Sequence, residues 1–188
     1  MAGLAGKPLS KEHGRNCRKA VDYRGVLMQP QDPPYALHSG IASAVLDTNV
    51  VLALYWFQDA RLARLAQALR TGQLRWLATS GMRDELSHVL QRLHAGADAD
   101  RIRRPEDDGG CGTPDVLGIF DRWAIPAALA SIGPSPRCTD AADQIFIDLA
   151  LASRSSWLLS RDRAVLKLRR RILALTGCKV QRPEEWPG

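Results

Sequence analysis

The chain has 188 residues, of which 45% are hydrophobic and 24% are charged. A chain of this length supports one well-packed domain but not two of ordinary size. No apolar run approaches the ~20 residues that a membrane-spanning helix needs, and the first thirty residues lack the apolar block of an export signal. We therefore expect a cytoplasmic protein with no membrane partner.

The net charge indicates what kind of partner the chain binds, and the spacing of the cysteines indicates whether they bind zinc or form disulfides. The formal net charge is +6, which favours an anionic partner such as nucleic acid. The four cysteines stand singly, without the spacing of a zinc site or the density of a secreted disulfide scaffold. We interpret them as reduced thiols with mostly structural roles; they are Cys17, Cys111, Cys138 and Cys178.

The N-terminal part of the chain differs in composition from the rest. Residues 1–42 are rich in Gly, Pro, Lys and Arg and have little hydrophobic periodicity, which predicts a flexible basic leader. Such a leader either contacts RNA or has no role of its own, and we favour the second interpretation. The folded domain is then expected over residues 43–188.

The first half of this domain predicts two strands and two helices in alternation. Residues 44–47 read as a short buried strand, and residues 60–70 carry apolar side chains at the spacing of an amphipathic helix. A second strand is expected at 74–79, followed by a helix whose apolar stripe runs to residue 93, with Thr79 or Ser80 as its N-cap. The polar, glycine-rich residues 94–114 predict an exposed loop.

The second half continues the alternation. We expect a helix over 115–131 and another over 140–153, the latter capped by Thr139 or Asp140 and burying Ala142 together with Ile145, Phe146 and Leu149. A strand at 157–160, a short helix ending at residue 168 and a final strand at 178–181 complete the pattern. Strands separated by helices predict an α/β fold, a three-layer α/β/α sandwich with a central parallel sheet.

Four acidic residues stand where such a sheet would bring them together. Asp47 and Asp162 each follow an apolar strand, and ligands of open parallel sheets gather at the carboxyl ends of the strands. Glu85 lies beside core-facing Leu86, and Asp143 opens a helix. Any one of the last three could instead be a cap or a solvated surface charge. Asp47 has apolar neighbours on both sides of the Asp-Thr-Asn triplet, so a buried and partnered carboxylate is expected.

Converging carboxylates repel one another and need compensation. Hard divalent cations supply it, because Mg2+ prefers oxygen ligands and is often held by one or two carboxylates together with waters and phosphate oxygens. Such an ion can activate water and stabilise the charge that develops when a phosphodiester breaks. The four acids therefore predict metal-assisted phosphodiester chemistry.

Four sequence blocks resemble, in order, the acidic blocks of the PIN domain ribonucleases. They are VLDTNVVL, RDELSHVL, CTDAADQIFIDLALA and LLSRDRAVL. The chain is most similar to a bacterial subgroup classed as toxin components of toxin-antitoxin systems, over about residues 43–186. The resemblance implies a PIN-like sandwich and an endoribonuclease that uses Mg2+ or Mn2+.

The resemblance also implies the site residues and partners. The metal-binding and catalytic acids would be Asp47, Glu85, Asp143 and Asp162. Weaker candidates for supporting these acids or contacting phosphate are Thr48, Asn49, Ser160 and Arg161, and basic residues near the acids, including the run 169–171, could extend a phosphate track. The substrate would be single-stranded RNA, and an antitoxin protein and a second copy of the chain are candidate partners.

Other functions fit the residues less well. A phosphatase of the haloacid dehalogenase type needs a D-x-D pattern, and Asn49 occupies its second acidic position. A nucleotide-binding oxidoreductase needs a glycine-rich loop after the first strand, which the sequence lacks. A non-catalytic RNA- or protein-binding module on the same fold is kept as the alternative.

Overall fold

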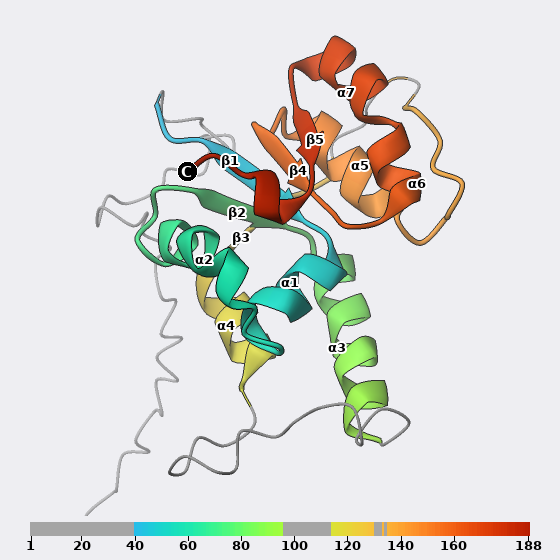
Figure 1. Cartoon of the computed structure of the whole chain (residues 1–188). Coiled ribbons are helices and arrows are strands. Elements are labelled where there is room, and N and C mark those ends of the chain that lie inside the picture. The colour runs from blue at the N-terminus through green and yellow to red at the C-terminus, as the bar shows by residue number, and fades with distance from the viewer. Residues whose placement is uncertain (1–39, 96–113, 130–132, 134) are drawn as a thin grey trace, which may run out of the picture. The chain divides into compact units, whose positions relative to one another are not determined.

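The computed structural model describes residues 40–95, 114–129, 133 and 135–188 (Figure 1). The leader predicted for residues 1–42 therefore falls almost wholly outside the described residues, as does most of the predicted 94–114 loop. The described residues contain a sheet of parallel strands in the order β3-β2-β1-β4-β5. These strands are β1 (Ser43–Leu46), β2 (Arg75–Ala78), β3 (Ala124–Pro126), β4 (Trp157–Leu159) and β5 (Lys179–Gln181).

The central strand is β1, and it is buried along its whole length. Val45 pairs with Leu77 of β2 on one side and with Leu158 of β4 on the other. A parallel strand covered on both faces must be apolar throughout, which explains why β1 has no alternating pattern. Because β1 is central, the residue that follows it emerges in the middle of the carboxyl edge.

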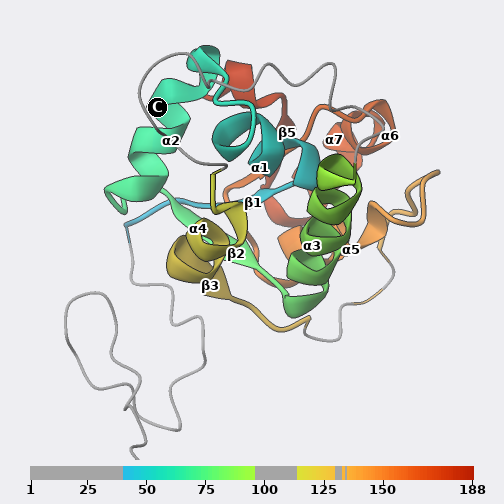
Figure 2. The same ribbon diagram turned by 90° about the horizontal axis from the view of Figure 1, so that it is seen from below.

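Helices cover both faces of the sheet. The chain moves from β1 to β2 to β3 in one direction and returns to β4 and β5 in the other, so right-handed crossovers place the later helices opposite the earlier ones. Figures 1 and 2 show α2 and α4 on one side and α5 to α7 on the other, and α3 contacts both α4 and α5. The helices are α1 (Thr48–Tyr55), α2 (Ala63–Arg70), α3 (Ser80–His94), α4 (Val116–Trp123), α5 (Gln144–Ala152), α6 (Arg163–Lys167) and α7 (Arg169–Thr176), with 3-10 turns η1 (Ala60–Leu62) and η2 (Pro183–Glu185).

The three-layer α/β/α sandwich predicted from the sequence is confirmed, as are the predicted strands at 44–47, 74–79, 157–160 and 178–181. The N-cap of α3 is Thr79, whose hydroxyl accepts a hydrogen bond from the Met82 N–H at 3.2 Å. Within the described residues, no helix has the length and apolar character needed to cross a membrane.

The helix predicted over 115–131 is wrong in its second half. The helix α4 ends at Trp123, and the next three residues form β3, which pairs with β2 at the edge of the sheet. Three residues are too few for a period to be read, and a proline such as Pro126 is tolerated only at an edge of this kind. Helices α1 and α7 were likewise not predicted.

The helix predicted over 140–153 begins later than expected. The helix α5 starts at Gln144, and neither Thr139 nor Asp140 caps it. Instead, the Asp140 carboxylate accepts a hydrogen bond from the Ala142 N–H at 2.9 Å within a turn, and Ala142 is exposed rather than buried. An Asx turn and a helix cap have the same residue preference, so the sequence alone does not distinguish them.

A glycine at the end of α7 gives a stability prediction. Gly177 adopts a left-handed conformation with φ of 78°, and nothing lies within 4 Å of the position that a Cβ would occupy. Gly177→Ala should therefore lower the free energy of unfolding by about 1 kcal/mol through backbone strain alone. The matched control is Gly133→Ala, which also enters open space but at a φ outside the left-handed region. Urea unfolding that shows equal stability of the two variants would contradict this interpretation.

Candidate active site

The first site residue, Asp47, follows β1 and is 1% exposed. It is the N-cap of α1, and one carboxylate oxygen, Oδ1, accepts a hydrogen bond from the Asn49 N–H at 3.1 Å. The other oxygen, Oδ2, accepts a hydrogen bond from the Ser160 hydroxyl at 2.5 Å. Burial raises the pKa of Asp47, while the Ser160 and Asn49 hydrogen bonds oppose that rise. The buried carboxylate thus has two partners within the protein.

The loop after β4 carries the second acid of the site. Ser160 is fully buried and donates its only hydroxyl proton to Asp47, so its oxygen is free to accept the Asp162 N–H at 2.9 Å. Asp162 in turn caps α6, accepting a hydrogen bond from the Ala164 N–H at 2.5 Å. A single hydroxyl therefore joins the carboxyl ends of β1 and β4 and fixes the distance between the backbone segments that carry Asp47 and Asp162.

The third acid, Glu85, lies on α3 and is half-buried. Burial raises its pKa, a hydrogen bond from the Thr48 hydroxyl lowers it, and the nearby charge of Asp47 raises it. The first turn of α3 comes close to α5 because residue 81 is glycine: a Cβ there would lie 3.0 Å from Cδ1 of Ile145. This close approach brings the helix bearing Glu85 to the start of α5.

The fourth acid, Asp143, immediately precedes α5. Burial raises the pKa of Asp143 to about 7, and the charges of Asp47, Asp162, Asp140 and Glu85 add to that rise. Its Oδ2 atom is buried and has no hydrogen-bond partner. The structure therefore brings all four predicted acids into electrostatic contact, and Asp143 is the one whose carboxylate the protein leaves unsatisfied.

Two further residues belong to these surroundings. The negative charge of Asp140 raises the pKa values of both Glu85 and Asp143. Burial raises the pKa of the half-buried Cys138 thiol, and so do the charges of Asp143 and Asp162. The sequence signal for both was only their position in the CTDAAD run, where a cap for Asp140 and a structural thiol for Cys138 are the more ordinary expectations.

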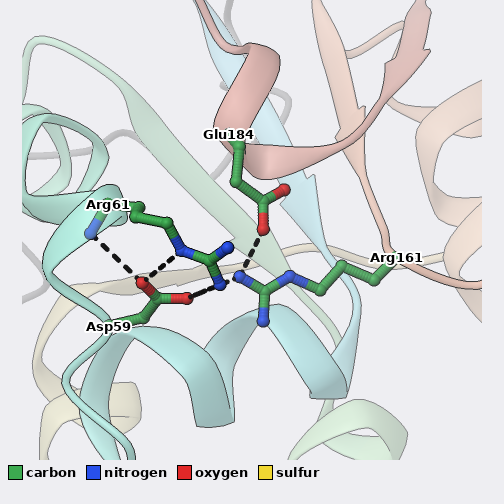
Figure 3. Close-up of polar contacts among 4 residues, drawn as sticks. All are labelled: Asp59, Arg61, Arg161 and Glu184. Carbon is green, nitrogen blue, oxygen red and sulfur yellow. Dashed lines mark hydrogen bonds and ion pairs between the residues drawn. The ribbon is translucent and has the colours of Figure 1, made fainter.

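The two remaining weaker candidates differ in what they offer to a ligand. The side chain of Asn49 is exposed, and its backbone N–H serves Asp47. The guanidinium of Arg161 is instead engaged in ion pairs with Asp59 at 2.8 Å and with Glu184 (Figure 3).

The ion pairs of Arg161 belong to a wider network. Asp59 also accepts hydrogen bonds from the Arg61 side chain at 2.7 and 2.9 Å, and Arg61 and Arg161 together hold the pKa of Asp59 well below its usual range. Because Arg161 lies between Ser160 and Asp162, this network ties the loop bearing the site to the loop after α1 and to η2 near the C-terminus.

The donor set suits a hard divalent cation with few protein ligands. All the acids offer carboxylate oxygens, and the unpartnered Oδ2 of Asp143 is a donor with no other function in the fold. Among the described residues, no three His, Cys, Asp or Glu side chains stand close enough together to hold one ion between them. An ion bound here would therefore take one or two carboxylates directly and complete its shell with waters, a mode of binding that Mg2+ accepts.

The raised pKa of Asp143 predicts how stability depends on pH without metal. The folded state binds the Asp143 proton more tightly than the unfolded state, so the stability contributed by this group falls as pH rises from its ordinary value of 3.8 to about 7. In EDTA, Asp143→Asn should raise the free energy of unfolding, by roughly 1 kcal/mol at pH 8 after allowance for solvent screening.

This gain should be smaller at pH 5, where the native carboxyl is largely protonated and the repulsion is already relieved. Thermal unfolding of both proteins at the two pH values measures the difference. Asp84→Asn, at an exposed position on α3, is the control and should have little effect. A variant that is destabilised at pH 8 would show that the Asp143 carboxylate is not under repulsion.

Comparison with known proteins agrees with the geometry. No curated protein and no solved structure matches the chain. The family model of the PIN domain matches residues 43–164. This match covers more than half of the chain and includes all four acids, from Asp47 after β1 to Asp162 before α6. The chain therefore belongs to the PIN domain family.

Proposed function

We propose that this protein is a metal-dependent endoribonuclease that cleaves single-stranded RNA. The observation that carries the proposal is the cluster of Asp47, Glu85, Asp143 and Asp162 at the carboxyl edge of the sheet, in which Asp143 is unpartnered and its pKa is raised to about 7. Membership of a nuclease family supports the same reaction class. Carboxylates held this close repel one another and destabilise the fold, unless a cationic ligand compensates their charge.

The cation that the site would take is Mg2+ or Mn2+. Asp47, Asp143 and Asp162 would hold it, directly or through waters, since their oxygens are the hard ligands that these ions prefer. When bound, the ion lowers the pKa of water and stabilises negative charge on a phosphoryl group. The Ser160 hydroxyl would hold the Asp47 carboxylate in one orientation during the reaction, because the hydrogen bond between them is buried and short.

In this proposal Glu85 is the proton acceptor. Burial raises its pKa, an effect that the Thr48 hydroxyl partly opposes, and a carboxylate with a raised pKa is suited to act as a general base. The carboxylate takes a proton from the attacking water as the water oxygen bonds to phosphorus and the bond from phosphorus to the 3′ oxygen breaks. The 3′ oxygen takes a proton from solvent, and the products carry 5′-phosphate and 3′-hydroxyl ends, as the resemblance implies.

The biological role that we propose is that of the toxin component of a toxin-antitoxin pair in the cytoplasm. The resemblance of the four acidic blocks to that subgroup supports it. An antitoxin protein would then be the regulatory partner, and a second copy of the chain is a further candidate partner. A short open reading frame next to this gene, whose product co-purifies with the chain and inhibits it, would support the toxin role.

Cleavage of RNA by variants of Asp47 tests the proposal. Wild-type protein with Mg2+ or Mn2+ should cleave a fluorescent single-stranded RNA, and EDTA should abolish cleavage. Asp47→Asn should reduce the rate by about 100-fold or more, because it removes charge from the metal site while keeping the shape of the side chain. Asp84→Asn, next to Glu85 but exposed, should retain the wild-type rate.

The same experiment separates the nuclease from the alternative, a non-catalytic RNA- or protein-binding module. A module of that kind would bind the RNA without cutting it under either metal, and folded Asp47→Asn would bind as the wild type does. Circular dichroism of each variant ensures that lost cleavage is not lost folding.

A further inference from the structure

The positive charge of the chain is concentrated in one segment next to the site. Residues 163–182 contain seven Lys and Arg and no Asp or Glu. The whole chain carries +6, so all its other residues together carry −1. This segment begins directly after Asp162 and contains α6, α7 and β5.

Five of these cations form an exposed surface, which we call the α6–α7 basic surface; they are Arg163, Lys167, Arg169, Arg170 and Arg171. Arg163 and Lys167 are one helical turn apart and share a face of α6. In α7, Ile172 is fully buried and anchors the helix. Arg170 lies nearly opposite it and Arg171 to one side, whereas Arg169, three residues earlier, is on the side of Ile172 but is still exposed. Figure 1 shows α6 and α7 following one another from the end of β4.

The cations of this surface have no carboxylate partners among the described residues. By contrast, Arg83 pairs with Asp121 on α4, and Arg161 pairs with Asp59 and Glu184. Lys179 is also engaged, since its ammonium lies 4.9 Å from the centroid of the Trp157 ring. Unpaired like charges on two short helices repel one another, and an anionic ligand would relieve that repulsion.

We propose that the α6–α7 basic surface binds the RNA phosphates next to the scissile bond, so that the strand runs from the acids over α6 to the first turn of α7. This inference rests on the proposed nuclease function. An RNA strand is itself anionic and is repelled by the acids that must cut it, so its affinity has to come from cations beside them. The surface meets that need because its first member, Arg163, adjoins Asp162.

A protein partner is the other ligand that this region could take. Leu173 and Leu175 on α7 are 48% and 58% exposed, and leucines next to arginines would suit an acidic amphipathic helix. Continuity with the site favours RNA. The first cation of the surface, Arg163, directly follows Asp162, whereas the two leucines lie farther along the chain.

Matched charge variants test the proposal. One variant replaces Arg169, Arg170 and Arg171 with Gln. The control replaces three exposed arginines that precede strands and therefore lie toward the opposite, amino edge of the sheet, with the same change in net charge; these are Arg70, Arg122 and Arg154. Both sets are made in the Asp47→Asn background with Mg2+ present, so that binding of a fluorescent oligouridylate is measured without cleavage.

The α7 variant should bind the oligouridylate roughly tenfold more weakly at about 150 mM salt, and the slope of log Kd against log salt should fall by about 2, because three contacts are lost. The control should stay within about twofold of its parent, since it removes the same charge at a distance. In the cleaving background the α7 variant should raise KM and leave kcat nearly unchanged.

Equal weakening in both triple variants would mean attraction by overall charge, and it would overturn the proposal. Unchanged affinity of the α7 variant would overturn it too and leave this surface to an acidic protein partner. The affinity measurement in the Asp47→Asn background does not depend on cleavage. Failure of the nuclease proposal would instead appear as absent cleavage by the wild type, whatever the two triple variants bind.

Discussion

The structure of the site depends on one buried hydrogen bond, from the Ser160 hydroxyl to the Asp47 carboxylate. A carboxylate at the end of a central, wholly buried strand would be very unfavourable without a partner. Ser160 supplies one from the adjacent strand, and the same oxygen accepts the N–H of Asp162. One hydroxyl thus stabilises Asp47, sets the position of Asp162 and joins β1 to β4 where the site begins.

The other acids are not compensated in this way. Thr48 bonds to Glu85, but Asp143 faces four carboxylates with one oxygen buried and unpartnered. The fold thus supports this arrangement at a cost in stability. A proton relieves that cost at low pH, and in the proposed function a divalent cation would relieve it near neutral pH. In the proposed function, the acids at the centre would hold the ion and the cations of the α6–α7 basic surface would hold the anionic strand.

The sequence was sufficient to predict the parts of the fold that depend on burial. Apolar runs next to Asp47 and Asp162 predicted buried strands, and the order of strands and helices predicted the sandwich. The edge strand β3 was missed because it has three residues, one of them Pro126, and its pairing with β2 depends on tertiary contact. The convergence of the four acids followed from topology. Ser160 was a candidate for supporting the acids through the family resemblance alone. Its particular hydrogen bonds, and the engagement of Arg161 by Asp59, do not follow from topology, because the bonded residues lie about a hundred residues apart in the sequence.

In the proposed function, these carboxylates form a divalent-cation site in which the ion replaces a proton. Calorimetric titration with Mn2+ at pH 7, in two buffers of different ionisation enthalpy, measures both the binding and the protons released. Since burial and nearby carboxylates raise the pKa of Asp143 to about 7, we expect saturable binding that releases protons from the proposed site. Absence of binding, or binding with no proton release, would contradict it.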